Sequence, residues 1–582
     1  METKSELILK GIAAAPGISI SKAYLYKKEV ESANNEKVED VDEALENFEF
    51  AREKSKKELN KVLSLAVDKL GKKRGAIFEA QIMILDDPFL IDKIKNRISA
   101  EKINPEYIVD NEISKYQKIL NDSDESYMKE RSRDIEDIKY RIIRNLKKKK
   151  WKSRIDSEVV VVTESLTPAD TILFSRENVS GYVTNFGGLT SHAAILARSL
   201  SIPAVLGVHD ATSQIEPEDI VVIDGFHGLV YVNPTEERLE HFRERIKKLE
   251  LFDKELDKLK KVKAVTKDGR RINIHGNLDL REELELMISN GAEGIGLVRT
   301  EQITEEYEEF PGEEEQLKIY NALAEKLYPK TMTIRVLDIG GDKVLPVDVK
   351  EPNPFLGWRG IRFLEDNVPL FKTQIRAILR ASNHKNIRLM IPMITSMEEI
   401  INTKNLIELC KKELKKEGLQ FDEDIKIGIM IEVPSAAVMA KEYASEVDFI
   451  SIGTNDLIQY LLAVDRGNDI VQKLYQEFHP AVIRVLNNII NDVKIESKID
   501  VSICGEMAAD PLAVPLLVGI GLDTLSVSAA AIPQTKKIIR SLNYSEVRLL
   551  AEECLSLRTE NEIKEKVKKF YNEKLIDCTV QY

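Results

Sequence analysis

The feature that most constrains the fold is a strand-then-helix rhythm that repeats eight times after Val265. Each candidate strand is a short apolar or β-branched run, and a helix-patterned segment follows it. The strands are expected at Ile272–Asn277, Ile295–Arg299, Thr333–Asp338, Ile387–Pro392, Lys426–Glu432, Phe449–Gly453, Asp500–Cys504 and Thr524–Val527. Eight such units over about 310 residues predict a (β/α)8 barrel of the TIM type. Periodicity alone also fits a doubly wound sheet.

A barrel collects its chemistry beyond the carboxyl ends of its strands, and polar side chains stand there in this sequence. The candidates are Arg299-Thr300-Glu301, Arg335 with Asp338 to Lys343 behind it, Glu432, Asn455-Asp456 with Arg466 one helix later, and Cys504 to Met507. Arginine matches phosphate and carboxylate oxygens, Mg²⁺ needs one or two carboxylates plus substrate oxygens, and a thiol can protonate a carbanion-like carbon. A single arginine or aspartate at a strand end more often forms a structural ion pair, and a single cysteine is more often a packed small apolar residue. Their shared location is what indicates an anion-and-metal pocket.

A second candidate site lies in the segment Gly187–Arg198, which opens with a glycine pair. Thr190 or Ser191 can cap a helix whose first turn holds His192. An imidazole there lies beside free backbone N–H groups and the positive end of the helix dipole, which suits a nitrogen that carries a phosphoryl group. An isolated capped histidine is more often an ordinary surface residue, and the rest of the chain favours the chemical interpretation.

The segments before the barrel indicate a divided domain. Strand patterns over residues 1–25 and 148–233 predict one α/β domain built from two pieces. Residues 26–147 are helical, charged and poor in glycine, with amphipathic stretches at Leu45–Leu65 and Ala76–Ile94. They predict a helical domain inserted between the two pieces.

A connector and the barrel complete the predicted organisation. Residues 234–264 alternate charges and space their leucines helically, which predicts a long exposed linker helix. The barrel domain then takes residues 265–582. The whole chain is therefore expected to be a multidomain α/β protein.

Composition excludes several function classes. A net charge of −13 without a basic arm argues against nucleic-acid binding. The longest apolar run, Pro511–Leu522, is about half a membrane span, and the first residues lack a signal-peptide layout, so no membrane insertion is expected. The four cysteines form no CxxC pair and no disulfide pattern. These observations predict a cytoplasmic protein.

In its motifs and their order, the chain resembles enzyme I of the bacterial phosphoenolpyruvate (PEP):sugar phosphotransferase system, the PEP–protein phosphotransferase family. The resemblance covers nearly the whole chain. Its motifs are GGLTSHAAILARSLSIPAVLG at 187–207, RTE at 299–301, IRVLDIGGDK at 334–343, NPFLGWRGIR at 353–362, EVPSAA at 432–437, FISIGTNDLIQYLLAVDRGN at 449–468 and ICGEMAADP at 503–511. FEAQIMILDDP at 78–88 also resembles the family's helical domain, which docks the phosphocarrier HPr.

The resemblance implies a role for each candidate. His192 would accept the phosphoryl group of PEP and pass it to a histidine of HPr, and Cys504 would protonate the enolate to release pyruvate. The other implied roles are binding of the PEP phosphate by Arg299 and Arg335 with support from Arg466, substrate binding by Asn455, Mg²⁺ ligation by Glu432 and Asp456, and orientation of the resting histidine by Thr171.

The resemblance also implies motion and self-association. The phosphohistidine domain would swivel between the PEP site and HPr. The barrel would form a homodimer, for which the apolar stretch Leu512–Leu522 could supply contact surface or could equally be core.

Three residues depart from the family's usual pattern. Leu189 stands where an arginine is usual, Gln302-Ile303 replaces an aromatic-leucine pair, and Ile458 replaces a frequent threonine. None removes an implied ligand or the acceptor. Leu189 does remove a positive charge beside His192, and that charge would help to stabilise a phosphohistidine.

Other functions remain open at this point. A pyruvate–phosphate dikinase or PEP synthase shares the histidine segment and the barrel but needs an ATP-grasp domain, for which no phosphate-binding loop is visible. A nitrogen-branch enzyme I would carry an additional N-terminal sensory domain. A regulator that senses PEP with weak catalysis would keep the same motifs, and the three departures leave that alternative open.

Overall fold

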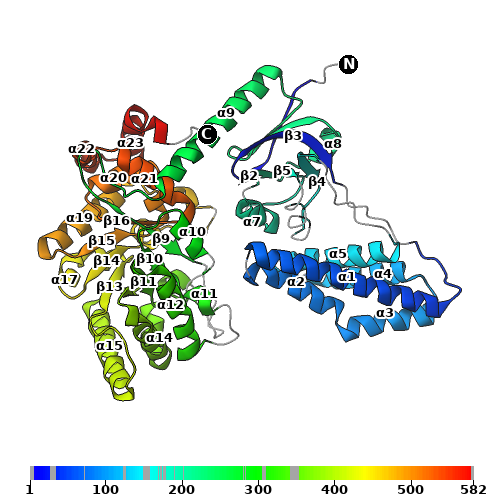
Figure 1. The fold of residues 1–582 in the computed structure, drawn as a ribbon, viewed down its shortest axis with the longest axis horizontal. Coiled ribbons are helices and arrows are strands. Elements are labelled where there is room, and N and C mark those ends of the chain that lie inside the picture. Colours follow the sequence, from blue (N-terminus) through cyan, green and yellow to red (C-terminus); the bar gives the residue numbers. More distant parts are fainter. Residues whose placement is uncertain are drawn as a thin grey trace. The chain divides into compact units, whose positions relative to one another are not determined.

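A computed structural model of the chain describes residues 5–578 apart from 27–33, 71, 122–125, 149–156, 168, 169, 171–173, 175–177, 189, 190, 201, 280, 282, 305–309, 341–350, 352 and 469. The chain divides into two compact units, Met1–Leu249 with Tyr582 and Glu250–Gln581. The first unit holds a sheet domain and a helical domain, and the second holds a barrel (Figure 1).

The sheet domain contains eight strands in the order β1-β8-β7-β3-β4-β5-β6-β2. They are β1 (Leu7–Lys10), β2 (Ile12–Ala15), β3 (Ile18–Leu25), β4 (Val159–Thr163), β5 (Val179–Thr184), β6 (Ala204–Leu206), β7 (Ile220–Asp224) and β8 (Leu229–Val232). The valines of β4 are buried on both faces: Val160 and Val162 pack into one cluster, Val159 and Val161 into another. The second cluster includes alanines of α7 (His192–Ser199), and α8 (Ala211–Gln214) is a single turn.

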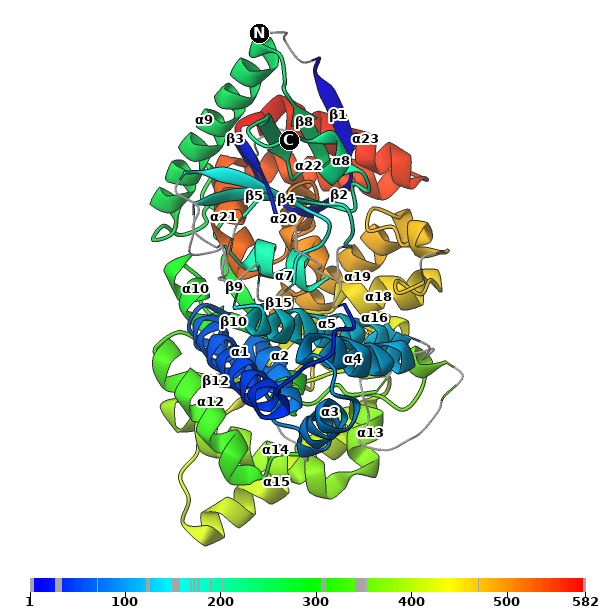
Figure 2. The same cartoon turned by 90° about the vertical axis from the view of Figure 1, so that its right-hand side faces the viewer.

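The helical domain is an insertion into this sheet, because β3 and β4 pair directly in parallel although the insertion separates them in sequence. Its helices are α1 (Val41–Leu70), α2 (Lys72–Leu85), α3 (Pro88–Glu101), α4 (Pro105–Asn121) and α5 (Ser126–Leu146), which pack alongside one another (Figure 2). The amphipathic stretch predicted over Ala76–Ile94 is divided between α2 and α3. Asp87 caps α3 by accepting from the Phe89 N–H, and Pro88 suits only a first turn.

The predicted linker helix is α9 (Glu236–Leu259). Its first turns are not exposed as predicted, since Leu239 and Phe242 are buried with Tyr231 in the first unit. In the second unit, the ammonium of Lys537 lies 4.2 Å from the ring centre of Phe252. The helix therefore contributes side chains to the packing of both units.

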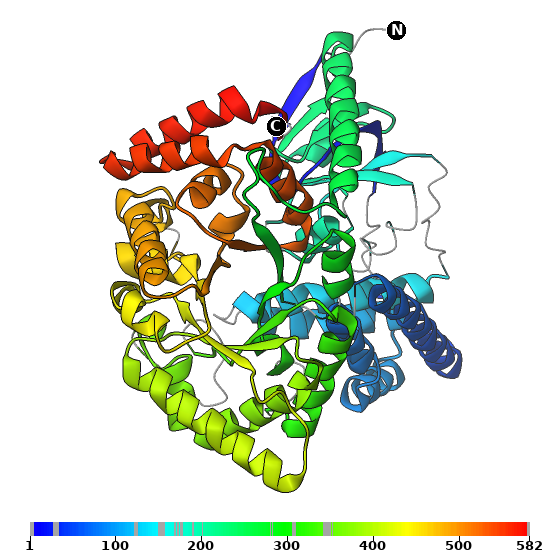
Figure 3. The same cartoon turned by 60° about the vertical axis from the view of Figure 1, so that its left-hand side comes forward.

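The second unit is a closed barrel of eight parallel strands, which confirms the predicted (β/α)8 fold (Figure 3). The strands are β9 (Asn273–Leu278), β10 (Ile295–Val298), β11 (Met332–Arg335), β12 (Ile387–Ile391), β13 (Lys426–Ile431), β14 (Phe449–Ile452), β15 (Asp500–Ile503) and β16 (Thr524–Val527). The pairing of β16 with β9 closes the ring and excludes the doubly wound alternative.

Helices cover the outside of this barrel (Figure 3). They are α10 (Glu283–Ser289), α11 (Glu301–Thr304), α12 (Glu313–Leu327), α13 (Ile361–Asp366), α14 (Val368–Ala381), α15 (Met397–Glu417), α16 (Pro434–Val438), α17 (Ala440–Ala444), α18 (Thr454–Leu462), α19 (Pro480–Glu496), α20 (Ala513–Gly519), α21 (Ile532–Ser541), α22 (Tyr544–Ser556) and α23 (Glu560–Lys574). All of α20 is buried, so the apolar stretch Leu512–Leu522 belongs to the core rather than to a contact surface.

The barrel interior has its own apolar cluster, formed by Leu297, Met390, Met430, Phe449 and Cys504. These side chains come from different strands, and alternate residues of a strand point to the same face. The same alternation directs Arg335 and Glu432 inward at the carboxyl ends of β11 and β13. The fold thus brings the predicted polar residues together at the carboxyl ends of the strands, next to the apolar cluster inside the barrel.

Candidate active site

The histidine segment forms the capped helix that its sequence predicts. Gly187 has a φ of 139° and leads the chain from β5 towards α7. The Ser191 hydroxyl donates to the Gly188 carbonyl at 2.8 Å and accepts from the Ala194 N–H at 3.3 Å, so Ser191 is the cap. His192 is the first residue of α7, at the helix end where N–H groups are free. Thr171 and Leu189 lie outside the described residues.

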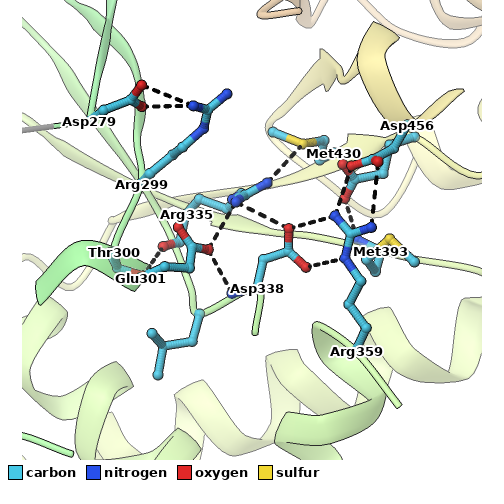
Figure 4. Close-up of polar contacts among 12 residues, drawn as sticks. Asp279, Arg299, Thr300, Glu301, Arg335, Asp338, Arg359, Met393, Met430 and Asp456 are labelled. Carbon is cyan, nitrogen blue, oxygen red and sulfur yellow. Dashed lines mark hydrogen bonds and ion pairs between the residues drawn. The ribbon is translucent and has the colours of Figure 1, made fainter. Parts of the chain in front are cut away.

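Three arginines lie at or beyond the carboxyl ends of the barrel strands, and two of them, Arg335 and Arg359, meet at Asp338 (Figure 4). The first, Arg299, follows β10, and its Nη1 donates to both carboxylate oxygens of Asp279 at 2.9 and 3.0 Å. Its side chain is 37% exposed. A pair of this exposure contributes little to stability, so Arg299 can turn towards an anionic ligand at small cost.

Arg335 is buried and points into the barrel. Its Nη2 donates to Glu301 at 2.9 Å and lies 3.1 Å from an oxygen of Asp338. Burial lowers the pKa of the Arg335 guanidinium, but Glu301 and Asp338 outweigh burial and hold that pKa above its ordinary value. Its Nε is buried and has no hydrogen-bond partner among the described residues. A buried cation with a spare donor suits an oxyanion.

Arg359 lies between two carboxylates and is 3% exposed. Its Nε and Nη2 donate to the two oxygens of Asp338 at 2.9 and 3.0 Å, and Nη2 also donates to Asp456 at 2.8 Å. Gly340 permits this approach: its φ is 102°, and a Cβ there would lie 2.2 Å from the Trp358 carbonyl oxygen. The sequence assigned no role to Arg359, and its only indication was its place in the motif NPFLGWRGIR.

Glu432 follows β13 and is almost fully buried, with Oε1 accepting from the Met393 N–H at 2.7 Å. Burial, with the charges of Asp338 and Asp456, raises the pKa of Glu432 to about 7, and Arg335 and Arg359 act in the opposite direction. The nearby positive charge is therefore too small to keep this carboxylate fully ionised at neutral pH. An added divalent cation would stabilise its charged form.

The donor set at Glu432 and Asp456 fits Mg²⁺. Both residues offer hard carboxylate oxygens, and Asp456 lies in the first turn of α18. Among the described residues no group of three or more histidine, cysteine or acidic side chains could hold a metal. Two carboxylates are enough for Mg²⁺, because this ion keeps waters and takes substrate oxygens.

Asn455 and Arg466 lie at the two ends of the segment that contains α18. The Asn455 carboxamide bonds to Glu506 after β15. Arg466 is partly exposed, and its backbone N–H donates to Gln459 Oε1 at 3.1 Å. Burial raises the pKa of Tyr475 while Arg466 lowers it, so the Arg466 charge acts close to Tyr475.

Cys504 follows β15 and belongs to the apolar cluster inside the barrel. Its Sγ lies 3.6 Å from the Ile452 carbonyl oxygen. Burial raises the pKa of the Cys504 thiol above its ordinary value. The thiol therefore stays protonated near neutral pH, as a proton donor must.

The structure thus brings most of the predicted residues to one end of the barrel. Arg299, Arg335, Glu432, Asp456 and Cys504 all stand at the ends of barrel strands. His192 belongs to the first unit and these residues to the second.

Comparisons with known proteins agree with this geometry. Three family models match: PEP-utilising enzyme, PEP-binding domain over residues 253–544, PEP-utilising enzyme, N-terminal over 10–131, and PEP-utilising enzyme, mobile domain over 155–228. The phosphoenolpyruvate-protein phosphotransferase of Listeria monocytogenes is 43% identical over 97% of this chain and 99% of its own. This chain belongs to the phosphoenolpyruvate-protein phosphotransferase family.

Further relatives carry the same name. The enzyme of Staphylococcus carnosus is 41% identical over 97% of this chain and 99% of its own. A solution structure of Enzyme I (nEIt) protein is 40% identical, with a TM-score of 0.37, and the match covers 42% of this chain and 99% of that one. In the part of this phosphotransferase that the structure describes, no helix has the length and apolarity needed to cross a membrane.

Proposed function

We propose that this phosphotransferase moves the phosphoryl group of PEP to His192 and then to a histidine of HPr, releasing pyruvate as the first step of a sugar phosphotransferase system. The observation that carries the proposal is the meeting of Arg335, Arg359, Glu432 and Asp456 at the barrel mouth. Relatives that share the family name align end to end with this chain, which favours this function over a dikinase or a regulator.

The barrel residues bind and orient PEP. Arg299 and Arg335 hold the phosphate, and Arg466 supports the same end of the substrate. Arg335 is suited to this because Glu301 and Asp338 hold its guanidinium in place and keep it charged. Asn455 contacts the substrate from the start of α18. Fixed cations at a buried site stabilise the charge of the moving phosphoryl group without reorganisation.

Glu432 and Asp456 hold Mg²⁺ in this proposal. When bound, the ion supplies Lewis-acid stabilisation for the oxygens of PEP and of the departing enolate. Arg359 positions Asp456 and, through Asp338, the end of β11. The two carboxylates are thus held in place before substrate arrives.

The chemical step needs a free lone pair on the attacking nitrogen of His192. As the N–P bond forms, the O–P bond of PEP breaks and leaves the enolate of pyruvate. The Cys504 thiol then gives its proton to the enolate carbon and becomes a thiolate, which solvent reprotonates. HPr, docking on the helical domain, takes the phosphoryl group from His192.

Mapping the phosphoryl group tests the proposal. Incubation with labelled PEP and Mg²⁺ is expected to place one acid-labile phosphoryl group per chain on His192, because a phosphoramidate hydrolyses in acid. Peptide mapping by mass spectrometry at alkaline pH locates it. Label on a different histidine, or label that persists in a His192→Ala protein, contradicts the assignment.

The barrel also forms a homodimer in this proposal. Since α20 is core, the contact surface must lie elsewhere, and we assign it to exposed apolar side chains around α16 and α19. Val438 on α16 is 77% exposed and Ile495 on α19 is 74% exposed, and the Lys441–Glu496 ion pair joins α17, the helix after α16, to α19. Removing such side chains from water favours association.

Sedimentation of the full chain tests the dimer. The Val438→Glu, Ile495→Glu double variant is expected to raise the dimer dissociation constant at least ~100-fold, because each glutamate would be desolvated in the contact. Leu549→Glu, which alters a residue of 61% exposure on α22, is the matched control. A double variant that stays dimeric places the contact on another surface.

A further inference from the structure

The loop after β15 holds the side chain of Asn455. The Asn455 Nδ2 donates to Glu506 Oε1 at 3.2 Å, and its Oδ1 accepts from the backbone N–H of Glu506 at 2.9 Å. One residue therefore contacts both ends of the carboxamide.

These two contacts permit only one orientation of the amide. A backbone N–H can only donate and a carboxylate can only accept, so exchanging the amide oxygen and nitrogen would break both bonds. The arrangement uses the oxygen and one of the two Nδ2 hydrogens. Among the described residues no further partner takes the second hydrogen, which stays available to an acceptor.

Close approach of the two segments depends on Gly505. A Cβ at this position would lie 2.9 Å from Asn455 Oδ1 and 1.7 Å from Thr454 Oγ1. The Tyr475 hydroxyl also donates to the Asn455 carbonyl at 3.4 Å, which fixes the backbone of the same residue. The side chain and the main chain of Asn455 are thus both restrained.

We propose that Glu506 is a positioning residue for PEP binding, which fixes the Asn455 carboxamide with one N–H free for an anionic oxygen of the substrate. The inference rests on the proposed function, in which Asn455 contacts PEP. This role also explains why the exposed carboxylate of Glu506 lies at the mouth of an anion site, although its negative charge alone would repel the substrate. A carboxylate cannot offer a donor, so it selects the amide orientation.

Substitutions at Glu506 separate its hydrogen bond from its charge. Glu506→Ala is expected to raise the KM for PEP about three- to ten-fold with kcat within two-fold, because a free carboxamide must be ordered on binding. Glu506→Gln keeps an acceptor without the charge and is expected to restore KM to within two-fold of the parent. Glu477→Gln, which changes an acid close to Glu506 without touching Asn455, is the control.

A double-mutant cycle decides whether Glu506 acts through Asn455. Asn455→Ala is expected to raise the KM for PEP, and adding Glu506→Ala to it should change KM less than two-fold, in steady-state pyruvate release with HPr present. Multiplying effects, an unchanged KM in Glu506→Ala, or a Gln variant as weak as Ala overturns the inference. An unchanged KM in Asn455→Ala overturns it too and locates the failure in the assignment of Asn455 itself. Thermal unfolding of each variant confirms the fold.

Discussion

Replacing Glu432 or Asp456 by alanine is expected to lower PEP-dependent phosphorylation of His192 by about 10³-fold or more, equal to about 4 kcal/mol in the barrier. Each change removes one of two carboxylates available to Mg²⁺. Phosphoryl return from phospho-HPr to His192 should stay within about two-fold of the parent, because that exchange does not use the barrel. Both half-reactions can be followed by rapid quench with labelled donor.

The contrast between the two half-reactions tests whether the barrel and the histidine domain act separately. Loss of both in a folded variant would show that the barrel and the histidine domain do not work as separable modules. Glu565→Ala, at an exposed position of α23, is the control and should change neither rate. Added Mg²⁺ should not rescue Glu432→Ala, since the missing ligand is protein oxygen rather than metal.

Replacing Arg359 by methionine is expected to destabilise the barrel by about 3–5 kcal/mol, because removing one partner of a buried ion pair leaves the carboxylates buried without a compensating charge. The guanidinium contacts Asp338 through two bonds and Asp456 through two more, and both carboxylates are buried. PEP-dependent phosphorylation should fall about 10²-fold or more, since Asp456 loses the group that positions it. Denaturant unfolding of the full chain measures the first effect.

Arg359→Lys is expected to recover little of the stability and activity that Arg359→Met loses. The lysine ammonium keeps the charge but cannot donate to two carboxylates through a planar fork. Arg362→Lys is the matched control, because Arg362 bonds only to the carbonyls of Leu356 and Gly357 among the described residues. Full activity and stability in Arg359→Lys would mean that only the charge is needed there.

Much of the fold follows from local patterns. Short apolar runs predicted the positions of all eight barrel strands to within a few residues, because a parallel strand that is buried on both faces is apolar along its length. The ends of these strands also predicted where polar chemistry gathers, since closure directs them to one side. In the same way, the threonine and serine before an alanine-rich run predicted a capped helix start at His192, and the structure identifies Ser191 as the cap.

Other predictions depended on what packs against a segment. The apolar residues of Ala76–Ile94 keep one helical spacing throughout, so the pattern predicts a single helix. The helix boundary at Asp87-Pro88 changes only two residues and does not alter that spacing. The linker helix looks fully exposed in sequence, yet Leu239 and Phe242 pack on the sheet domain. For Leu512–Leu522, core and contact surface have the same composition, and burial of α20 decides between them.

The sequence by itself determined the eight strand–helix units, the inserted helical domain and the residue types at the strand ends, because these depend on periodicity within short windows. Closure of the eight strands into a barrel was decided by the pairing of β16 with β9. Only the tertiary structure showed that Arg359 joins Asp338 to Asp456 and that Glu506 bonds to both ends of the Asn455 carboxamide. The contacts of Arg359 with Asp456 and of Glu506 with Asn455 link residues from different strand–helix units. Such a pairing exists only after closure brings the strand ends together, and no local pattern encodes it.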